Sequence, residues 1–417
     1  MPQQQKIYYG WVIVGFTFAL QFVAVGLSYY AFGVFLKPLT EALDADRFLV
    51  SLAMPIQSVV MGVLSPLAGR MFAQSPIKPL LFCGLTCLTI AFLSLTQITA
   101  VWQLYILYGG LMGVGAALLG VIPSNLLLAN WFAAQRGRAM GISQFGLTIS
   151  GTVLVPALTF VLVQHGWQTA FLVGGIGAAV VLTPLIALFA VKTPEERGLH
   201  PDGASEPLPT PPITDTVDWT FRRAVTTRDI WCLTLTVGPC YLGISSVILG
   251  LPSHLDDLGL NAVDASFIVA MTILMGAIAK PCFGTLADYF NKKLVASVAI
   301  ALQATGVTLL LSAETYSSLL TAGMFFGLGY GAMSPLWAVM LAERYGRDAF
   351  AKVMGANMPM LMPFNIFGLP ITTYVFSLTG TYIPAFAGLL VLYAVALIAL
   401  YLFRLHPHGQ PDAATNN

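Results

Sequence analysis

The chain has 417 residues, of which 57% are hydrophobic and 9% are charged, and its net charge is +1. Soluble globular proteins carry about 25% charged residues, so the composition predicts a protein that crosses a membrane many times. A net charge near zero offers no basic surface for nucleic acid. The five cysteines all lie inside apolar runs, which argues against a disulfide framework.

Twelve apolar runs are each long enough to cross ~30 Å of hydrocarbon as a helix. Six lie at about 9–36, 49–72, 79–98, 102–129, 138–164 and 167–191. Six more lie at about 230–253, 263–287, 294–312, 317–342, 351–378 and 382–403. Runs of this length without alternation exclude barrel strands, so we expect an all-α membrane protein. The first run is too long for a signal-peptide core, and we expect it to be retained.

The longest polar stretch, 192–229, separates the two groups of runs and contains six prolines. This is the composition of a linker, and we expect it to fold little by itself. The predicted domains are an N-terminal six-helix half at 1–191, a cytoplasmic linker at 192–229, a C-terminal six-helix half at 230–404 and a cytoplasmic tail at 405–417.

The basic residues support this count of spans. With both termini in the cytoplasm, sixteen of the nineteen Lys and Arg residues fall on the cytoplasmic side, Lys37 and Arg47 fall outside, and Lys280 lies within a span. Omitting or adding one span would destroy this one-sided distribution of the basic residues. The positive-inside rule therefore predicts twelve spans with both ends inside, in the cytoplasmic (inner) membrane.

The two halves also resemble each other. After the fourth span the chain reads NWFAAQRGRAMGIS (130–143), and after the tenth it reads RYGRDAFAKVMGAN (344–357). Each stretch has an aromatic residue, a basic cluster and then Met-Gly at the start of the next span. This repetition indicates a duplicated six-helix unit, for which a binding site between the halves is expected.

Lys280 is the one charged residue that no loop accounts for. It follows Ala265 by fifteen residues and precedes Asp288 by eight, which places its backbone ~22 Å and ~12 Å from the two ends of a helix. A lysine at that depth costs about 2.5–3.5 kcal/mol on insertion scales and normally faces a water-filled path or an anionic partner. No Asp or Glu lies at comparable depth in another run, so we expect a ligand to supply the negative charge.

The segment GTLADYFNKK (284–293) resembles the loop signature of the major facilitator superfamily, roughly G-x-L-A-D-x-x-G-R-K, with Asn291 at the family glycine. In the equivalent first-half loop, GRMFAQSPIK (69–78), Ala73 stands where the aspartate would be. Three further stretches resemble the monocarboxylate porters and their oxalate/formate antiporter relatives. They are YYGWVIV with YYAFGVFLKPL in the first span, NWFAAQRGRAMGIS, and TPEERGLHPDG (193–203). The resemblance implies the twelve-helix major facilitator fold.

The same resemblance bears on Lys280. The segment AKPCFG (279–284) is similar to the eighth-span segment in which those relatives carry an arginine that binds the substrate carboxylate, and Lys280 stands at that position. Animal monocarboxylate porters have an aspartate one turn earlier, implicated in proton coupling, where this chain has Gly276. The oxalate-type relatives add a lysine in the eleventh span, and 355–368 has none. One buried cation suits a monoanion better than a dianion.

In this fold, helices 1, 4, 7 and 10 are expected to line the central path. The candidate substrate-binding residues beside Lys280 are therefore Tyr29, Tyr30, Asn125, Tyr241, Tyr330 and Trp337, with Gln57 and Asn357 from other spans. Asn125 can donate its amide to a carboxylate, but a helix–helix hydrogen bond, worth about 0.6 kcal/mol, explains it equally well. For the tyrosines, an interfacial or packing role is the stronger alternative.

A second group of candidates lies at the cytoplasmic ends of the spans. It consists of Arg136, Arg138, Gly284, Asp288, Glu343 and Arg347. As a topology signal these residues need no function. As superfamily loop residues they would hold the two halves together and part when the inside opens, and we expect this role for Asp288 in particular.

The sequence contains no H-E-x-x-H, paired-cysteine or Walker pattern, so we expect no metal, no cofactor and no enzymatic activity. The prediction is a monomeric secondary active transporter that moves a small organic monoanion, a monocarboxylate, across the lipid bilayer by alternating access. Lys280 would bind the carboxylate and also carry the coupling proton.

Three alternatives remain. One is an organic anion exchanger without proton coupling, and another is a transporter-like receptor that binds a carboxylate without moving it. The third, a drug–proton antiporter, would need buried carboxylates, which the apolar runs do not contain.

Overall fold

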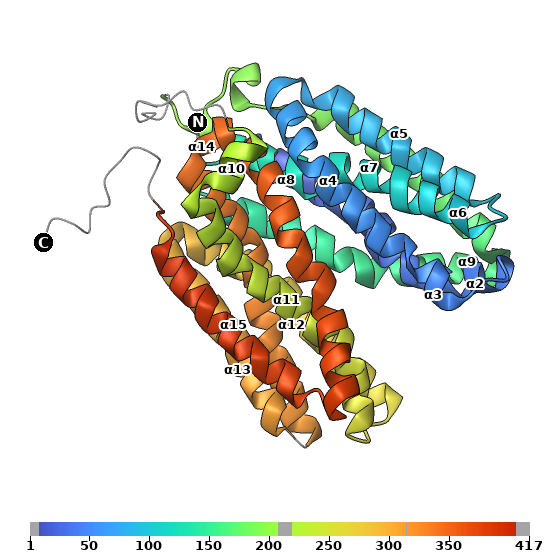
Figure 1. Ribbon diagram of the computed structural model, residues 1–417. Coiled ribbons are helices and arrows are strands. Elements are labelled where there is room, and N and C mark those ends of the chain that lie inside the picture. The colour runs from blue at the N-terminus through green and yellow to red at the C-terminus, as the bar shows by residue number, and fades with distance from the viewer. Residues whose placement is uncertain (1–7, 207–218, 314, 406–417) are drawn as a thin grey trace, which may run out of the picture. The chain divides into compact units, whose positions relative to one another are not determined.

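The computed structural model describes residues 8–206, 219–313 and 315–405, and its regular elements there are all helices (Figure 1). The predicted tail from 406 onward and the central part of the predicted linker, 207–218, lie outside the described residues. An all-helical chain satisfies its backbone hydrogen bonds within each segment, as a hydrocarbon environment requires.

The first four spans follow the predicted order. The first consists of α1 (Gly10–Val25), the π-helical turn η1 (Gly26–Tyr30) and α2 (Phe32–Ala42). The second consists of α3 (Arg47–Ser51) and α4 (Ala53–Gln74), and the third is α5 (Ile77–Leu95). The fourth consists of α6 (Val101–Leu104), the π-helical η2 (Tyr105–Leu111), α7 (Met112–Leu119) and α8 (Val121–Trp131).

Two helices are far longer than one span. They are α9 (Arg136–Phe189), with 54 residues, and α14 (Tyr316–Thr379), with 64. Each contains one glycine in the left-handed region, Gly166 with φ 83° and Gly346 with φ 69°. Glycine adopts this conformation without a Cβ penalty, so the chain can bend sharply there. Each long helix is therefore two spans that meet at a glycine, and the loop expected at 343–350 is largely helical instead.

The remaining spans are α11 (Arg228–Asp257), α12 (Ala262–Tyr289), α13 (Lys292–Ser312) and α15 (Ile383–Leu402). Within the described ranges, ten helical segments are long and apolar enough to cross a membrane. Two of these segments, α9 and α14, each supply two spans, so the helices agree with the predicted twelve. The location of both termini in the cytoplasm stays a prediction.

Residues 192–206 of the linker are held by contacts with the rest of unit 1. The 3-10 turns η3 (Pro194–Arg197) and η4 (Pro201–Gly203) are ordered there, and α10 (Phe221–Thr226) precedes α11. Composition alone missed this order because the partners are distant in sequence. The Asn130 side-chain amide, for example, donates to the Lys192 carbonyl at 3.0 Å.

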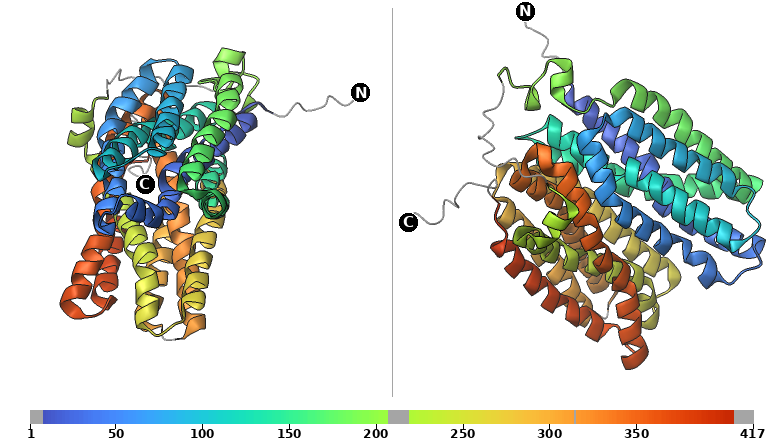
Figure 2. Two further views of the ribbon diagram at one scale, coloured as in Figure 1. Left: turned by 90° about the vertical axis from the view of Figure 1, so that its right-hand side faces the viewer. Right: turned by 45° about the horizontal axis from the view of Figure 1, so that its top comes forward.

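The chain divides into two compact units. Unit 1 is Met1–Asp218 together with Arg347–Gly355, and unit 2 is Trp219–Gly346 together with Ala356–Asn417. In unit 1, α1 packs along α9, and α5 packs against both α7 and α9. In unit 2, α15 packs against α11 and α13, as Figure 1 shows. The helices within each unit lie side by side along their lengths (Figure 2).

Close glycine contacts bring α12 and α14 together inside unit 2. A Cβ atom on Gly331 would overlap the carbonyl of Gly276. Overpacking of this kind costs typically 1–3 kcal/mol. We expect Gly331→Ala to lower the melting temperature of the purified protein by several degrees.

The matched control is Gly388→Ala in α15. A Cβ atom added at Gly388 would meet no other atom within 4 Å, and alanine is favoured over glycine in a helix by roughly 0.5–1 kcal/mol. Its melting temperature should equal or slightly exceed that of the wild type. Equal melting temperatures for Gly331→Ala and wild type would contradict the close contact between Gly331 in α14 and Gly276 in α12.

Candidate functional site

Lys280 lies inside α12 with only 5% of its surface exposed. Protein atoms alone produce this burial, so the lysine points into the protein rather than toward lipid. The other buried Asp, Glu, Lys and Arg side chains of the described chain are Asp229 and Arg344, which form an ion pair with each other. Pro281 follows Lys280 within the helix and lacks the N–H that the Ala277 carbonyl would accept, which leaves a polar backbone group near the lysine.

Tyr330 occupies the space one turn before Lys280. Its ring lies so close to Gly276 that a Cβ atom there would overlap the phenol. The Tyr330 hydroxyl lies 3.4 Å from the Ile273 carbonyl and donates to it. Gly276 therefore leaves room for the tyrosine ring. The Tyr330 phenol lies beside position 276, where the sequence has no acidic residue. Tyr330 and Lys280 thus belong to one region of unit 2.

A second group in unit 2 joins α11 to both parts of α14. The Trp337 indole donates to Asn357 Oδ1 at 2.8 Å, and Asn357 Nδ2 donates to Thr234 Oγ1 at 2.7 Å. The Tyr241 ring meets the Trp337 ring edge-on at 6.4 Å between centroids. Three predicted residues are thus brought together. In this conformation the Asn357 amide is used to connect helices.

Unit 1 contains a buried amide cluster. The Gln21 amide donates to Ser143 Oγ at 2.7 Å, and Gln144 Nε2 donates to Asn125 Oδ1 at 3.3 Å. All four side chains are fully buried. The Asn125 Nδ2 and Gln21 Oε1 atoms have no hydrogen-bond partner within the described part of the chain. A buried amide atom without a partner costs about 1–3 kcal/mol, so this cluster is suited to a polar ligand or an ordered water.

The other predicted residues of unit 1 are more dispersed. Tyr29 and Tyr30 lie in the π-helical turn η1 with their rings edge-on at 5.5 Å, and Tyr29 is 46% exposed. Gln57 is buried in α4, where its backbone carbonyl lies close to Gly113. Among the described residues, none of these three side chains forms a hydrogen bond with the amide cluster.

Two polar residues of these groups, Ser143 and Thr234, were not predicted from the sequence. Thr234, Gly238, Tyr241 and Ser245 recur at the spacing of one helical face of α11. That periodicity was the available signal for Thr234. Ser143 gave none, because its partner Gln21 is 122 positions away.

Four of the predicted gating residues make contacts that stay within one of the two units. Arg136 donates to the carbonyls of Phe132 and Ala129 at 3.0 and 3.2 Å, satisfying the end of α8, and the Arg138 guanidinium lies 4.9 Å from the Trp11 ring centroid. Two ion pairs follow nearer the break in α14. Glu343 pairs with Lys292 at 3.0 Å, and Arg347 pairs with Glu195 at 2.9 Å.

Asp288 and Gly284 lie in the last turns of α12. Asp288 is half-buried and Gly284 is buried. Asn291 lies between α12 and α13. Its side-chain oxygen accepts the backbone N–H of Lys293 at 2.9 Å and thereby starts α13. Asparagine thus acts as an N-cap at the position where the superfamily signature has glycine.

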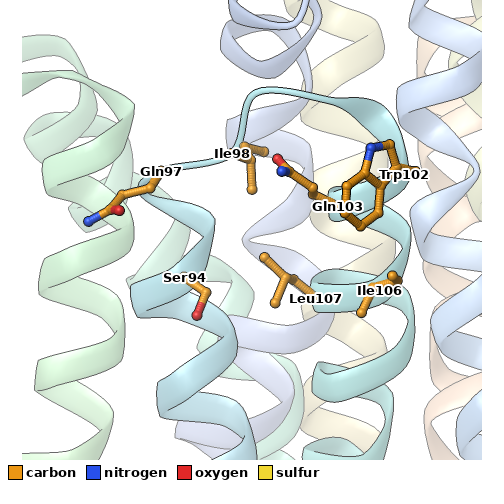
Figure 3. Close-up of a pocket in the computed structure, with 7 residues that line it drawn as sticks. All are labelled: Ser94, Gln97, Ile98, Trp102, Gln103, Ile106 and Leu107. Carbon is orange, nitrogen blue, oxygen red and sulfur yellow. The ribbon is translucent and has the colours of Figure 1, made fainter.

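Two surface pockets are unsuited to an anion. The pocket in Figure 3, about 250 Å³, lies where α5 ends and α6 begins, and its seven lining residues carry no charge. Gln103 within it caps the turn by accepting from the Thr99 amide at 2.7 Å. A larger groove of about 570 Å³ runs along α12 from Ala265 to Ile273, and the charged residue in its lining is Asp256. Lys280 therefore remains the centre of the candidate site.

Comparison with known proteins agrees with this architecture. The family model described as "Major Facilitator Superfamily" matches residues 18–245 and 233–416. Monocarboxylate transporter 2 of Homo sapiens is 23% identical over 393 residues, covering 90% of this chain and 81% of that protein. The uncharacterized MFS-type transporter YcxA of Bacillus subtilis (strain 168) is 24% identical and covers 83% of each.

A solved structure with the same fold is that of the proton:xylose symporter XylE. It matches 95% of this chain and 96% of its own with a TM-score of 0.76 and 14% identity. At that identity the likeness shows the fold alone, and the fold and family prediction is confirmed. The chain is a multi-pass membrane protein that belongs to the Major Facilitator Superfamily of transporters.

Proposed function

We propose that the protein is a secondary active transporter of a small organic monoanion, a monocarboxylate, and that Lys280 binds the carboxylate. The observation that carries this proposal is the burial of a lysine by protein in the middle of a span, one turn from the Tyr330 phenol. The similarity to monocarboxylate transporters over most of the chain supports the substrate class.

Electrostatics makes this role for Lys280 reasonable. A unit-charge pair at 4 Å is worth ~4 kcal/mol at an effective dielectric of 20. The insertion cost of a mid-span lysine is about 2.5–3.5 kcal/mol. A bound carboxylate is therefore strong enough to offset the cost of the lysine. One monoanion neutralises one lysine, whereas a dianion would bring an additional charge.

Transport would follow alternating access, with the halves predicted at 1–191 and 230–404 moving around the bound anion. Asp288 would bias the conformational equilibrium rather than the affinity. The rival functions are anion exchange and carboxylate sensing, and flux across a membrane separates sensing from both transport modes.

Replacement of Lys280 tests the site. Lys280→Gln should abolish binding of every monocarboxylate in a panel while expression is retained, because removing the charge also removes its insertion cost. Lys280→Arg should retain part of the affinity, since the charge stays but the planar guanidinium needs different partner geometry. Equilibrium binding to purified protein and uptake into proteoliposomes measure both effects.

The matched control is Lys37→Gln, because the side chain of Lys37 is 85% exposed and pairs with the exposed Glu41. Its binding should equal that of wild type. Wild-type affinity in Lys280→Gln would remove Lys280 from the site.

A separate prediction concerns the coupling ion. A bound carboxylate favours the protonated form of Lys280, so linkage requires that proton and anion promote each other's binding. They would then cross together as an electroneutral pair. We expect proteoliposomes without internal substrate to accumulate the anion when the outside is made acidic, and to stop when a protonophore collapses the gradient.

The exchanger gives a different result in the same vesicles. Its uptake would require internal substrate and would ignore the pH gradient. That outcome would remove the proton from the mechanism but leave Lys280 as the anion-binding residue.

A further inference from the structure

The groove of about 570 Å³ lies between the end of α11 and the beginning of α12. Its α12 wall runs from Ala265 to Ile273, and both walls belong to unit 2. Apart from Asp256, the lining residues that the structure describes are uncharged. At 1.5 Å per residue the α12 wall is ~12 Å long. The groove is therefore elongated and mostly apolar.

The groove lies on the same face of α12 as Lys280. Ser266, Ile273 and Lys280 follow one another at intervals of seven residues, and positions so spaced on an α-helix differ in direction by only ~20°. Side chains on a helix lean toward its N-terminus, which in α12 is the end that holds the groove. The Lys280 side chain should therefore extend toward the groove from a backbone that is ~10 Å beyond Ile273.

Tyr330 connects the groove to the lysine. Its ring fills the space beside Gly276, one turn before Lys280. Its hydroxyl donates at 3.4 Å to the carbonyl of Ile273, the lining residue nearest to Lys280 in the helix. The groove, the phenol and the ammonium thus follow one another along one helix face inside unit 2.

An apolar groove that leads to a buried cation is complementary to an amphipathic anion. A charged head is costly to bury unless it is paired, whereas a hydrocarbon tail gains free energy by leaving water. Lys280 can pair with the head, and the uncharged lining can cover the tail. The groove is unsuited to a carboxylate by itself, but it suits the part of a carboxylic acid that carries no charge.

We propose that the groove holds the hydrocarbon tail of the transported monocarboxylate while Lys280 binds its carboxylate. The substrate class is then a monocarboxylate with an elongated, unbranched tail. Asp256 lies beside the α11–α12 connection, at the end of the groove away from Lys280, and it disfavours a second carboxylate there because like charges repel. The inference rests on the proposed function, since it requires Lys280 as the site of the head, and it adds the shape of the substrate.

A series of straight-chain acids from acetate to decanoate tests the proposal. Each acid competes with labelled butyrate for purified wild-type protein in detergent. Burial of one methylene strengthens binding by up to about fourfold. We expect the inhibition constant to fall by about two- to fourfold for each added methylene until the groove is filled.

Filling the groove should remove this dependence on length. Ala270→Phe adds a ring to the lining, and the exposure of Ala270 allows the ring to be added without disturbing the core. The affinity for decanoate should fall by about tenfold or more, toward that for butyrate, because several methylenes lose their contact. Val269→Phe should act in the same direction from the neighbouring position.

The matched control is Val298→Phe in α13, where the side chain is 45% exposed and lies outside the lining of the groove. This variant should keep the wild-type dependence on chain length. Lys280→Gln should lose the whole series, because the tail alone is not sufficient for binding.

Each failure has its own signature. A wild-type affinity that does not change with chain length, or a dependence that survives both Ala270→Phe and Val269→Phe, would overturn the tail site and leave Lys280 as the anion-binding residue. Decanoate binding that persists in Lys280→Gln would separate the groove from the lysine and would also overturn the proposal. Binding of none of the acids by the wild type would overturn the proposed function together with this inference.

Discussion

The structure depends on one constraint, that a backbone N–H or C=O in hydrocarbon must find its partner inside the protein. The spans meet it as continuous helices, even where two of them are joined without a loop. Gly166 and Gly346 turn the chain within α9 and α14 and keep the helical bonds on either side. With the backbone satisfied in this way, Lys280 and the buried amide cluster are polar side chains inside the protein that the helices themselves do not require.

Much of this could be predicted from the sequence because bilayer physics acts on local composition. Twenty apolar residues in a row and the alternation of basic loops are visible without any tertiary information. Lys280 stood out for the same reason, since its depth within a run can be counted. The break in α9 at Gly166 was predicted to within a few residues, because the fifth and sixth apolar runs meet there. The helix through 343–350 was not predicted, because the polar composition of that stretch suggested a loop.

The parts that could not be predicted rest on contacts between distant positions. The structure of residues 192–206 comes from Asp202 binding the amides before α9 and from Lys192 binding the Ala73 carbonyl at the end of α4. Neither pairing leaves a local pattern. The same holds for Ser143 in the amide cluster. Composition described the linker by its prolines, whereas its structure is determined by two charged residues whose partners lie 69 and 119 positions away.

The contact between Gly276 and Tyr330 has a consequence for how such a site can change over time. An acidic side chain at 276 requires the Tyr330 ring to move, because the end of the ring already occupies that volume. Removing the tyrosine alone would leave a cavity where the ring had been. Changing both positions together avoids the overlap and the cavity. Residues 276 and 330 should consequently vary together among descendants of a common ancestor.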